Sequence, residues 1–134
     1  MKIYIAAPWK FRAEMPFIAG KFEQIGCEIT RKWWEAEDTP EHERSIETLR
    51  EQAEQDVLGV TDANLVVVIN SAKSEGKALE QGVAVAQRKP IIIVGKRGEF
   101  SQNVFHYLKL YKWVESLDQA LEIVTTIKWL LGDK

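Results

Sequence analysis

Glu80 stands in the sequence context that best fits carboxylate chemistry in a ligand site. It follows an apolar run, 65–69, and a polar loop, and its neighbours four positions away are small, Gly76 and Ala84. Small neighbours leave room for a ligand over the carboxylate, and open α/β sheets bind ligands just beyond the carboxyl ends of their strands. An exposed acid on an amphipathic helix fits the same pattern. On the pattern alone, the two interpretations carry equal weight.

Asp56 is a second acid in an unusual position. It lies beside Ala53 and Val57, close to the apolar face of a charged amphipathic helix expected over residues 41–60. An acid next to an apolar face is usually paired or used. Exposure at the helix edge is nevertheless the interpretation that the pattern favours. In a simple arrangement, Asp56 reaches a cleft at the carboxyl edge of the sheet only if the helix is tilted across it.

Candidate binding residues lie near the ends of two expected strands. Tyr4, within the first strand, is either a core residue or a phenol that orients a carboxylate, and Trp9 in the following loop either packs or stacks on a ring. Lys10 is either a solvated charge or a phosphate contact. Before the acid-bearing helix, the backbone N–H groups around Ser74 and Gly76 would attract an anion.

The elements that must position these residues alternate along the chain. Apolar and β-branched runs predict strands, and 3.6-residue periodicity predicts helices between them. Such alternation predicts an α/β fold, a single-domain, doubly wound and mostly parallel five-stranded sheet of order 2-1-3-4-5 over residues 1–134. The expected strands are 2–7, 27–30, 65–69, 91–94 and 112–114, and the expected helices are 12–26, 41–60, 77–87, 101–108 and 117–131.

Composition excludes several classes of protein. The chain has 134 residues, 46% hydrophobic content and a net charge of −2, which argues for one folded domain and against a nucleic-acid binder. Its apolar runs are too short to span a bilayer, and no signal peptide is evident. The single Cys27 fits a reducing compartment, so we expect a cytoplasmic protein. One Cys and two His disfavour a structural zinc site.

Three blocks of sequence resemble one known family. IYIAAPW, EQDVLGV and EGKALEQGVAVAQRKPIIIVG, in this order, resemble the nucleoside 2-deoxyribosyltransferase family, which includes deoxynucleoside 5′-monophosphate N-glycosidases. That family has a Tyr in the first strand, an Asp on the helix before the third strand, and a catalytic Glu in a glycine-containing signature. The corresponding residues here are Tyr4, Asp56 and Glu80, with Gly76 and Gly82 around the Glu.

The resemblance implies the reaction but leaves alternatives. It implies cleavage of the N-glycosidic bond of a 2′-deoxynucleoside, with transfer of the deoxyribosyl group to another base. One alternative is hydrolysis of a nucleoside 5′-monophosphate, and another is a nucleotide-binding module without turnover. Transferases carry an additional Asp six residues before the catalytic Glu, where this chain has Ser74, as monophosphate hydrolases do. The Ser/Arg/Gly-rich first loop of the hydrolases is replaced by Pro8-Trp9-Lys10.

The resemblance also implies residue roles. Glu80 would attack C1′ and form a glycosyl ester, Asp56 would supply a proton to the departing base, and Tyr4 would hold Glu80 in attack geometry. No metal or organic cofactor is needed, because the sugar ester itself carries the group. The predicted substrate-binding residues are Ala7, Trp9, Lys10, Ser74, Gly76 and Asn103.

The expected partners are a small nucleoside or nucleotide and further copies of the chain, with no nucleic-acid polymer and no membrane. The family resemblance implies a homo-oligomer, at least a dimer, in which a neighbour completes each site. The segment 101–108, SQNVFHYL, resembles the region that reaches the neighbour's site, and Asn103 is its best polar candidate. A helix-start residue is an equally good interpretation of Asn103.

Overall fold

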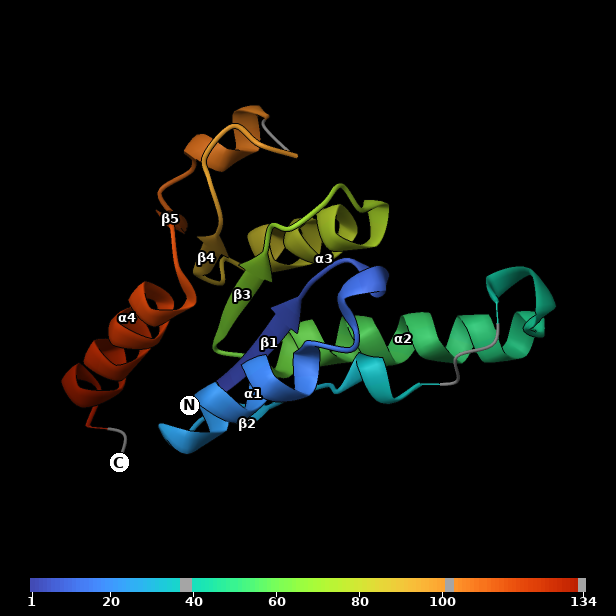
Figure 1. The fold of residues 1–134 in the computed structure, drawn as a ribbon, viewed down its shortest axis with the longest axis horizontal. Coiled ribbons are helices and arrows are strands. Elements are labelled where there is room, and N and C mark those ends of the chain that lie inside the picture. The colour runs from blue at the N-terminus through green and yellow to red at the C-terminus, as the bar shows by residue number, and fades with distance from the viewer. Residues whose placement is uncertain (37–39, 101–102, 133–134) are drawn as a thin grey trace.

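A parallel sheet forms the centre of the protein, as a computed structural model shows (Figure 1). The structure describes residues 1–36, 40–100 and 103–132, and these residues form one five-stranded sheet of order β2-β1-β3-β4-β5 in which every neighbouring pair is parallel. The predicted fold class and strand order are therefore confirmed. The strands are β1 (Lys2–Ala6), β2 (Glu28–Ile29), β3 (Leu65–Ile69), β4 (Ile91–Val94) and β5 (Tyr111–Val114).

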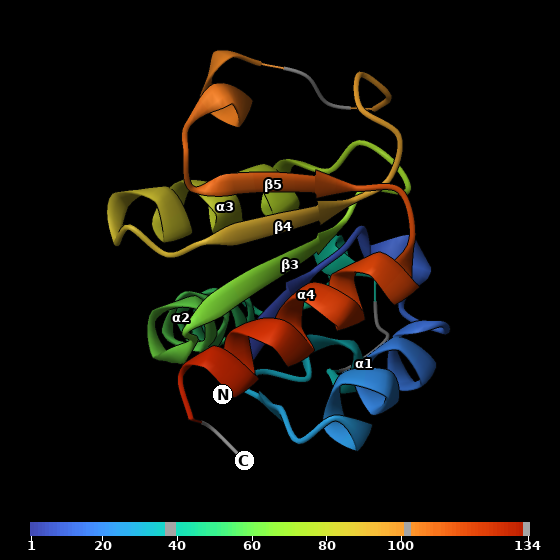
Figure 2. The ribbon, with the colours of Figure 1, turned by 90° about the vertical axis from the view of Figure 1, so that its left-hand side faces the viewer.

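Helices cover both faces of the sheet (Figure 2). One face carries α1 (Met15–Gln24) and α4 (Leu117–Leu130), and the other carries α2 (Ile46–Asp62) and α3 (Glu75–Ala86). Because both faces are covered, the central strands β3 and β4 are apolar throughout, and all five residues of β3 are buried. In the described part of the chain, no helix is long and apolar enough to cross a membrane.

Capping residues fix where two of the helical segments begin, and both segments are shorter than the apolar periodicity predicted. The predicted helix over 41–60 begins only at Ile46, because Ser45 caps it by accepting a hydrogen bond from the Thr48 N–H. Residues 41–43 instead form a short 3-10 helix, η3 (Glu41–Glu43). The predicted helix over 101–108 is reduced to η4 (Val104–Tyr107), capped by the Asn103 side chain, while residues 101–102 lie outside the described part.

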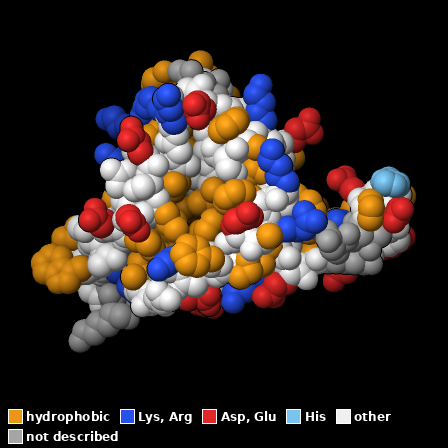
Figure 3. Space-filling model, viewed as in Figure 1, with side chains coloured by type: hydrophobic (Ala, Val, Ile, Leu, Met, Phe, Trp, Pro, Cys, Tyr) orange, Lys and Arg blue, Asp and Glu red, His pale blue; other side chains and the backbone are white. Residues whose placement is uncertain are grey.

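The apolar face of α2 is only partly covered. Helical periodicity places five apolar residues on one face of this helix, and of these Val60 is the one that is fully buried: Ile46, Leu49, Ala53, Val57 and Val60. Ile46 is 69% exposed and Val57 is 47% exposed. Hydrophobic side chains also gather in the centre of the view in Figure 3, where β1, β3 and α1 lie in Figure 1. The single chain therefore leaves apolar surface uncovered.

The length of α2 carries its middle to the carboxyl edge of the sheet. Its 17 residues span roughly 25 Å, whereas the 5 residues of β3 span roughly 16 Å. Because α2 ends where β3 begins, its first half must extend past the sheet, and Figure 1 shows it crossing the strands at an angle and projecting beyond them. This tilt is the condition under which Asp56 can reach the cleft.

Candidate active site

A cavity of about 740 Å³ lies where β1 and β3 end. This is the switch point of the sheet, where the crossover connections turn to opposite faces. Glu80 and Asp56 both line the cavity, from α3 and α2 respectively. Gln52 on α2 and Gly76 and Lys77 on α3 also line it. The remaining lining residues come from the segments between the strands and helices: Ala7, Trp9, Arg12, Arg31, Trp33, Ala36, Pro40, Glu41, Arg44 and Ser74.

Glu80 lies on the second turn of α3, where it is half-buried. The helix begins at Glu75 because the Ser74 hydroxyl accepts a hydrogen bond from the Lys77 N–H at 3.2 Å. Gly76, one turn before Glu80, has no side chain to cover the carboxyl group. Burial of the Glu80 carboxyl raises its pKa from 4.5 to about 8. Burial therefore favours the protonated form of this carboxyl group in the empty site.

Asp56 has a charged partner. Its Oδ1 accepts a hydrogen bond from Arg31 Nε at 3.1 Å, and the two side chains are 35% and 24% exposed. Burial raises the pKa of Asp56, and the hydrogen bond and positive charge of Arg31 oppose that rise. Asp56 is thus a partly shielded, paired acid, whereas the sequence pattern favoured exposure at the helix edge.

Lys77 fixes the loop between β3 and α3. Its side chain is buried, and Nζ donates hydrogen bonds to Asn70 Oδ1 at 2.8 Å and to the Ala72 carbonyl at 2.6 Å. Asn70 in turn donates to the Glu99 carbonyl at 2.9 Å. Burial lowers the pKa of Lys77 to about 8. The lysine therefore holds the cavity wall in shape, with its ammonium group already bonded within the protein.

Aromatic and cationic side chains form the wall opposite α3. The rings of Trp9 and Trp33 lie 5.9 Å apart, and Trp33 Nε1 donates to the Ile5 carbonyl at 2.8 Å. The guanidinium carbons of Arg12 and Arg44 lie 5.1 and 5.3 Å from the centre of the Trp9 ring. Cation–π contacts of this kind keep positive charge beside a flat ring. The wall can therefore accept both a planar group and an anionic one.

The predicted site residues fall into two groups. Those that line the cavity are Glu80, Asp56, Ala7, Trp9, Ser74 and Gly76. Those that do not are Lys10, which is exposed, Tyr4, whose buried hydroxyl has no hydrogen-bond partner among the described residues, and Asn103, which lies elsewhere. The roles assigned to all of them stay predictions.

Sequence reasoning missed much of the cationic and aromatic wall. Arg31 and Trp33 follow the short strand β2, which lies next to β1, so the rule that ligands bind at strand ends could have selected them. Arg44 precedes α2 and reaches the cavity because that helix projects past the sheet. Its sequence position carries no comparable signal.

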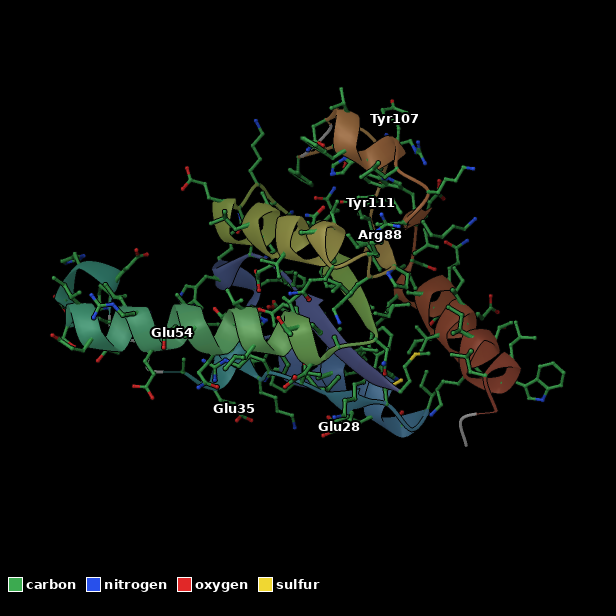
Figure 4. The ribbon with its side chains drawn as sticks, turned by 180° about the vertical axis from the view of Figure 1, so that it is seen from behind. Glu28, Glu35, Glu54, Arg88, Tyr107 and Tyr111 are labelled. Carbon is green, nitrogen blue, oxygen red and sulfur yellow. The ribbon has the colours of Figure 1, made fainter. Side chains whose placement is uncertain are left out.

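A second cavity of about 500 Å³ lies on the outer side of α3, beside η4. Asn103, His106, Gln81 and Tyr111 line it, and the Tyr111 hydroxyl donates to Gln81 Oε1 at 3.0 Å. Figure 4 shows Tyr107 on η4 and Tyr111 below it. Burial lowers the pKa of His106, which favours a neutral ring. Among the described residues, no group of three or more His, Cys, Asp or Glu side chains could hold a metal ion.

The fold and the position of the cavity define a class of structure, a doubly wound parallel α/β domain with a cavity at the switch point of its sheet. One similar solved structure is a CMP N-glycosidase from Clostridium botulinum, BcmB, with a TM-score of 0.62. The superposition covers 95% of this chain and 99% of that one, at 15% sequence identity. At this identity the match establishes a shared fold over nearly the whole chain. No protein-family model and no curated protein sequence matches the chain.

Proposed function

We propose that this protein hydrolyses the N-glycosidic bond of a nucleoside 5′-monophosphate and releases the free base and a sugar phosphate. The observation that carries the proposal is that Glu80 and Asp56 line one cavity together with cationic side chains. The shared fold with a CMP N-glycosidase supports the same reaction class and makes CMP the first substrate to test. Transfer of the sugar to a second base is the competing outcome.

The first chemical step forms a covalent intermediate. A carboxylate oxygen of Glu80 bonds to C1′ as the bond from C1′ to the base nitrogen breaks, and the electron pair of that bond stays on the base. Asp56 delivers a proton to the departing base. Ser74, where transferases carry an Asp, leaves the neighbourhood of Glu80 without a further acid from this loop.

The second step releases the sugar phosphate. A water oxygen bonds to C1′, the ester bond to Glu80 breaks and returns its electron pair to the carboxylate, and Asp56 accepts the proton of the water. One proton shared by the two acids suffices for the cycle. In the empty cavity burial favours that proton on Glu80, so it must pass to Asp56 or to the base as the substrate binds.

Charge supports a phosphorylated substrate. Among the described residues that line the cavity, four are cationic and three are acidic, and burial favours the neutral form of Glu80. The first turn of α3 adds backbone N–H groups behind Ser74. Lys77 and Arg31 are already bonded within the protein, so the positive charge would attract a 5′-phosphate through the net charge of the cavity, an attraction that a neutral nucleoside lacks.

Product analysis tests the proposal. The protein would be incubated with CMP, dCMP, the corresponding nucleosides and the purine monophosphates, with and without a free acceptor base, and the products separated by chromatography. We expect free base and sugar phosphate, formed at the same rate whether or not the acceptor base is present. Base exchange would identify a transferase, and binding without any product would identify a nucleotide-binding module.

A matched pair of variants secures the assignment of any activity to this cavity. Glu80→Gln removes the attacking carboxylate. Glu75→Gln changes an acid on the same helix that does not line the cavity. We expect loss of product with the first variant and wild-type product formation with the second. Equal activities of the two variants would contradict the proposal.

A further inference from the structure

Arg31 is held against α2 by contacts that do not involve its charge. It lies two residues past the end of β2. The adjacent Thr30 hydroxyl donates to the Gly59 carbonyl of α2 at 2.6 Å. A Cβ atom added at Gly59 would lie 2.6 Å from the Cβ of Arg31, so the helix backbone packs directly on the arginine stem. Only glycine allows this approach, which places Arg31 within one turn of Asp56 on α2.

The guanidinium group of Arg31 is committed to Asp56. Within the described residues, its one hydrogen bond runs from Nε to Asp56 Oδ1, at 3.1 Å. Both side chains line the cavity, and both are partly shielded from water. A charge-assisted bond in such a setting fixes geometry more firmly than an exposed ion pair does. By contrast, the neighbouring Lys32 makes an exposed pair with Glu23 at 3.4 Å, away from the cavity.

We propose that Arg31 is the positioning residue for Asp56, because its bond to Oδ1 fixes the rotamer of the carboxyl group and leaves the other oxygen to face the substrate. The inference rests on the proposed function, in which Asp56 exchanges a proton with the base and with water. Arg31 then acts through Asp56 and not on the substrate itself. The close packing at Gly59 keeps Arg31 next to Asp56.

The charges around Asp56 set the expected effect of removing the arginine. Of the charged side chains that line the cavity, Arg31 alone is within ion-pair distance of Asp56 in the described structure. Without Arg31, burial acts unopposed and the pKa of Asp56 rises further. The other charged groups facing the cavity come from the segment between β1 and α1, from η3 and the segment after it, and from α3, and they are Arg12, Glu41, Arg44, Lys77 and Glu80.

Two variants and one control test the proposal. Arg31→Met keeps the apolar stem that packs on Gly59 and removes the guanidinium group, and Arg31→Lys keeps the charge but loses the Nε donor. Lys32→Gln removes a neighbouring charge that is outside the cavity. The carboxyl titration of Asp56 would be followed by NMR on protein carrying carbon-13 in its aspartates. Kinetic constants for the nucleotide would be measured over a range of pH.

We expect the pKa of Asp56 to rise in Arg31→Met, to change less in Arg31→Lys, and to stay unchanged in Lys32→Gln. The acid limb of the rate profile should move to higher pH in the same order. kcat of Arg31→Met should fall roughly tenfold, with KM changed less than about threefold, because one orienting bond to a charged group is lost. In an Asp56→Asn background, the same change should cost nothing further.

Other results would overturn the proposal. An unchanged Asp56 titration in Arg31→Met shows that the pair does not form in solution, and the NMR measurement gives this answer without any substrate. A raised KM with unchanged kcat makes Arg31 a substrate-binding residue and not a positioning one. If the wild type cleaves no nucleotide, the proposed function fails, while the titration still decides whether Arg31 holds Asp56.

Discussion

Glu80 and Asp56 line the same cavity from neighbouring helices, yet their carboxyl groups meet different surroundings. Burial raises the pKa of both. Asp56 has the Arg31 guanidinium at 3.1 Å to oppose that rise, whereas burial is the sole cause of the shift of Glu80, to a pKa of about 8. Figure 4 shows the two helices, α2 and α3, side by side on one face of the sheet. The two carboxyl groups are therefore chemically alike but lie in different surroundings.

Different surroundings allow two carboxyl groups in one cavity to take different roles. Two acids that titrate together could not hold one proton in a defined place, whereas two that titrate apart can. The unpaired acid keeps the proton in the empty site, and the paired acid stays closer to its ionised form. Substrate binding must reverse that order for the proposed reaction, so each acid can be tested separately.

The largest effect is expected at the unpaired acid. Glu80→Gln keeps the shape and neutral charge of the protonated side chain but cannot form the ester. We expect turnover of the nucleotide to fall by several orders of magnitude, roughly a thousandfold or more, with the fold intact. Rates of base release and a circular dichroism spectrum measure both. Near-normal turnover in a folded Glu80→Gln variant would show that Glu80 does not form the ester.

Asp56→Asn should have the next largest effect. It keeps an acceptor for Arg31 but removes the group that exchanges a proton, so we expect kcat to fall roughly 100-fold while KM changes little. Steady-state kinetics with CMP, or with the best substrate found, would measure both constants. An increase in KM at constant kcat would instead make Asp56 a ground-state binding group.

How far the sequence could anticipate this comparison depends on the range of the interactions. β3 and β4 have the predicted bounds, because a strand buried on both faces is a continuous apolar run. Glu80 could be selected from its strand–loop–helix context. The pairing of Arg31 with Asp56 joins residues 25 positions apart, through a helix tilt and a glycine contact. No local pattern carries either feature.

The unpaired burial of Glu80 should also be visible in stability. Its pKa in the folded state, about 8, lies above its ordinary value of 4.5. Between these values the unfolded chain releases a proton that the folded state keeps, so wild-type stability contributed by this residue falls as pH rises. Glu80→Gln removes that penalty. We expect its Tm to exceed the wild-type Tm by more at pH 8 than at pH 5, by calorimetry; a pH-independent difference would argue against the raised pKa of Glu80.

In an oligomer, a second copy of the chain would place polar groups beside one of the two acids. Uncovered apolar surface on α2 and η4, including Val57, Leu58 and Phe105, supports the predicted homo-oligomer. Asn103 lies away from the cavity of its own chain. If it serves a neighbour's site, Asn103→Ala should raise KM by less than about tenfold without unfolding the protein.

Light scattering and activity on dilution would measure the assembly. We expect specific activity to fall as the protein is diluted below the dissociation constant of the oligomer, because each site loses its neighbour. Thr125→Ala, on α4 and outside both cavities, is a matched surface control for Asn103→Ala. A monomer with full activity at nanomolar concentration would show that one chain forms the complete site.

The smallest effect is expected at Tyr4, whose hydroxyl is predicted to orient Glu80 through one hydrogen bond. Its ring packs against Gly59, near Asp56, and its buried hydroxyl has no partner among the described residues. If the hydroxyl orients Glu80 when substrate is bound, Tyr4→Phe should lower kcat by roughly two- to tenfold, the value of one hydrogen bond. The same change should leave Tm equal or higher, because it removes a buried polar group without a partner. An unchanged kcat with a raised Tm would make Tyr4 a packing residue and leave Glu80 without an orienting hydroxyl.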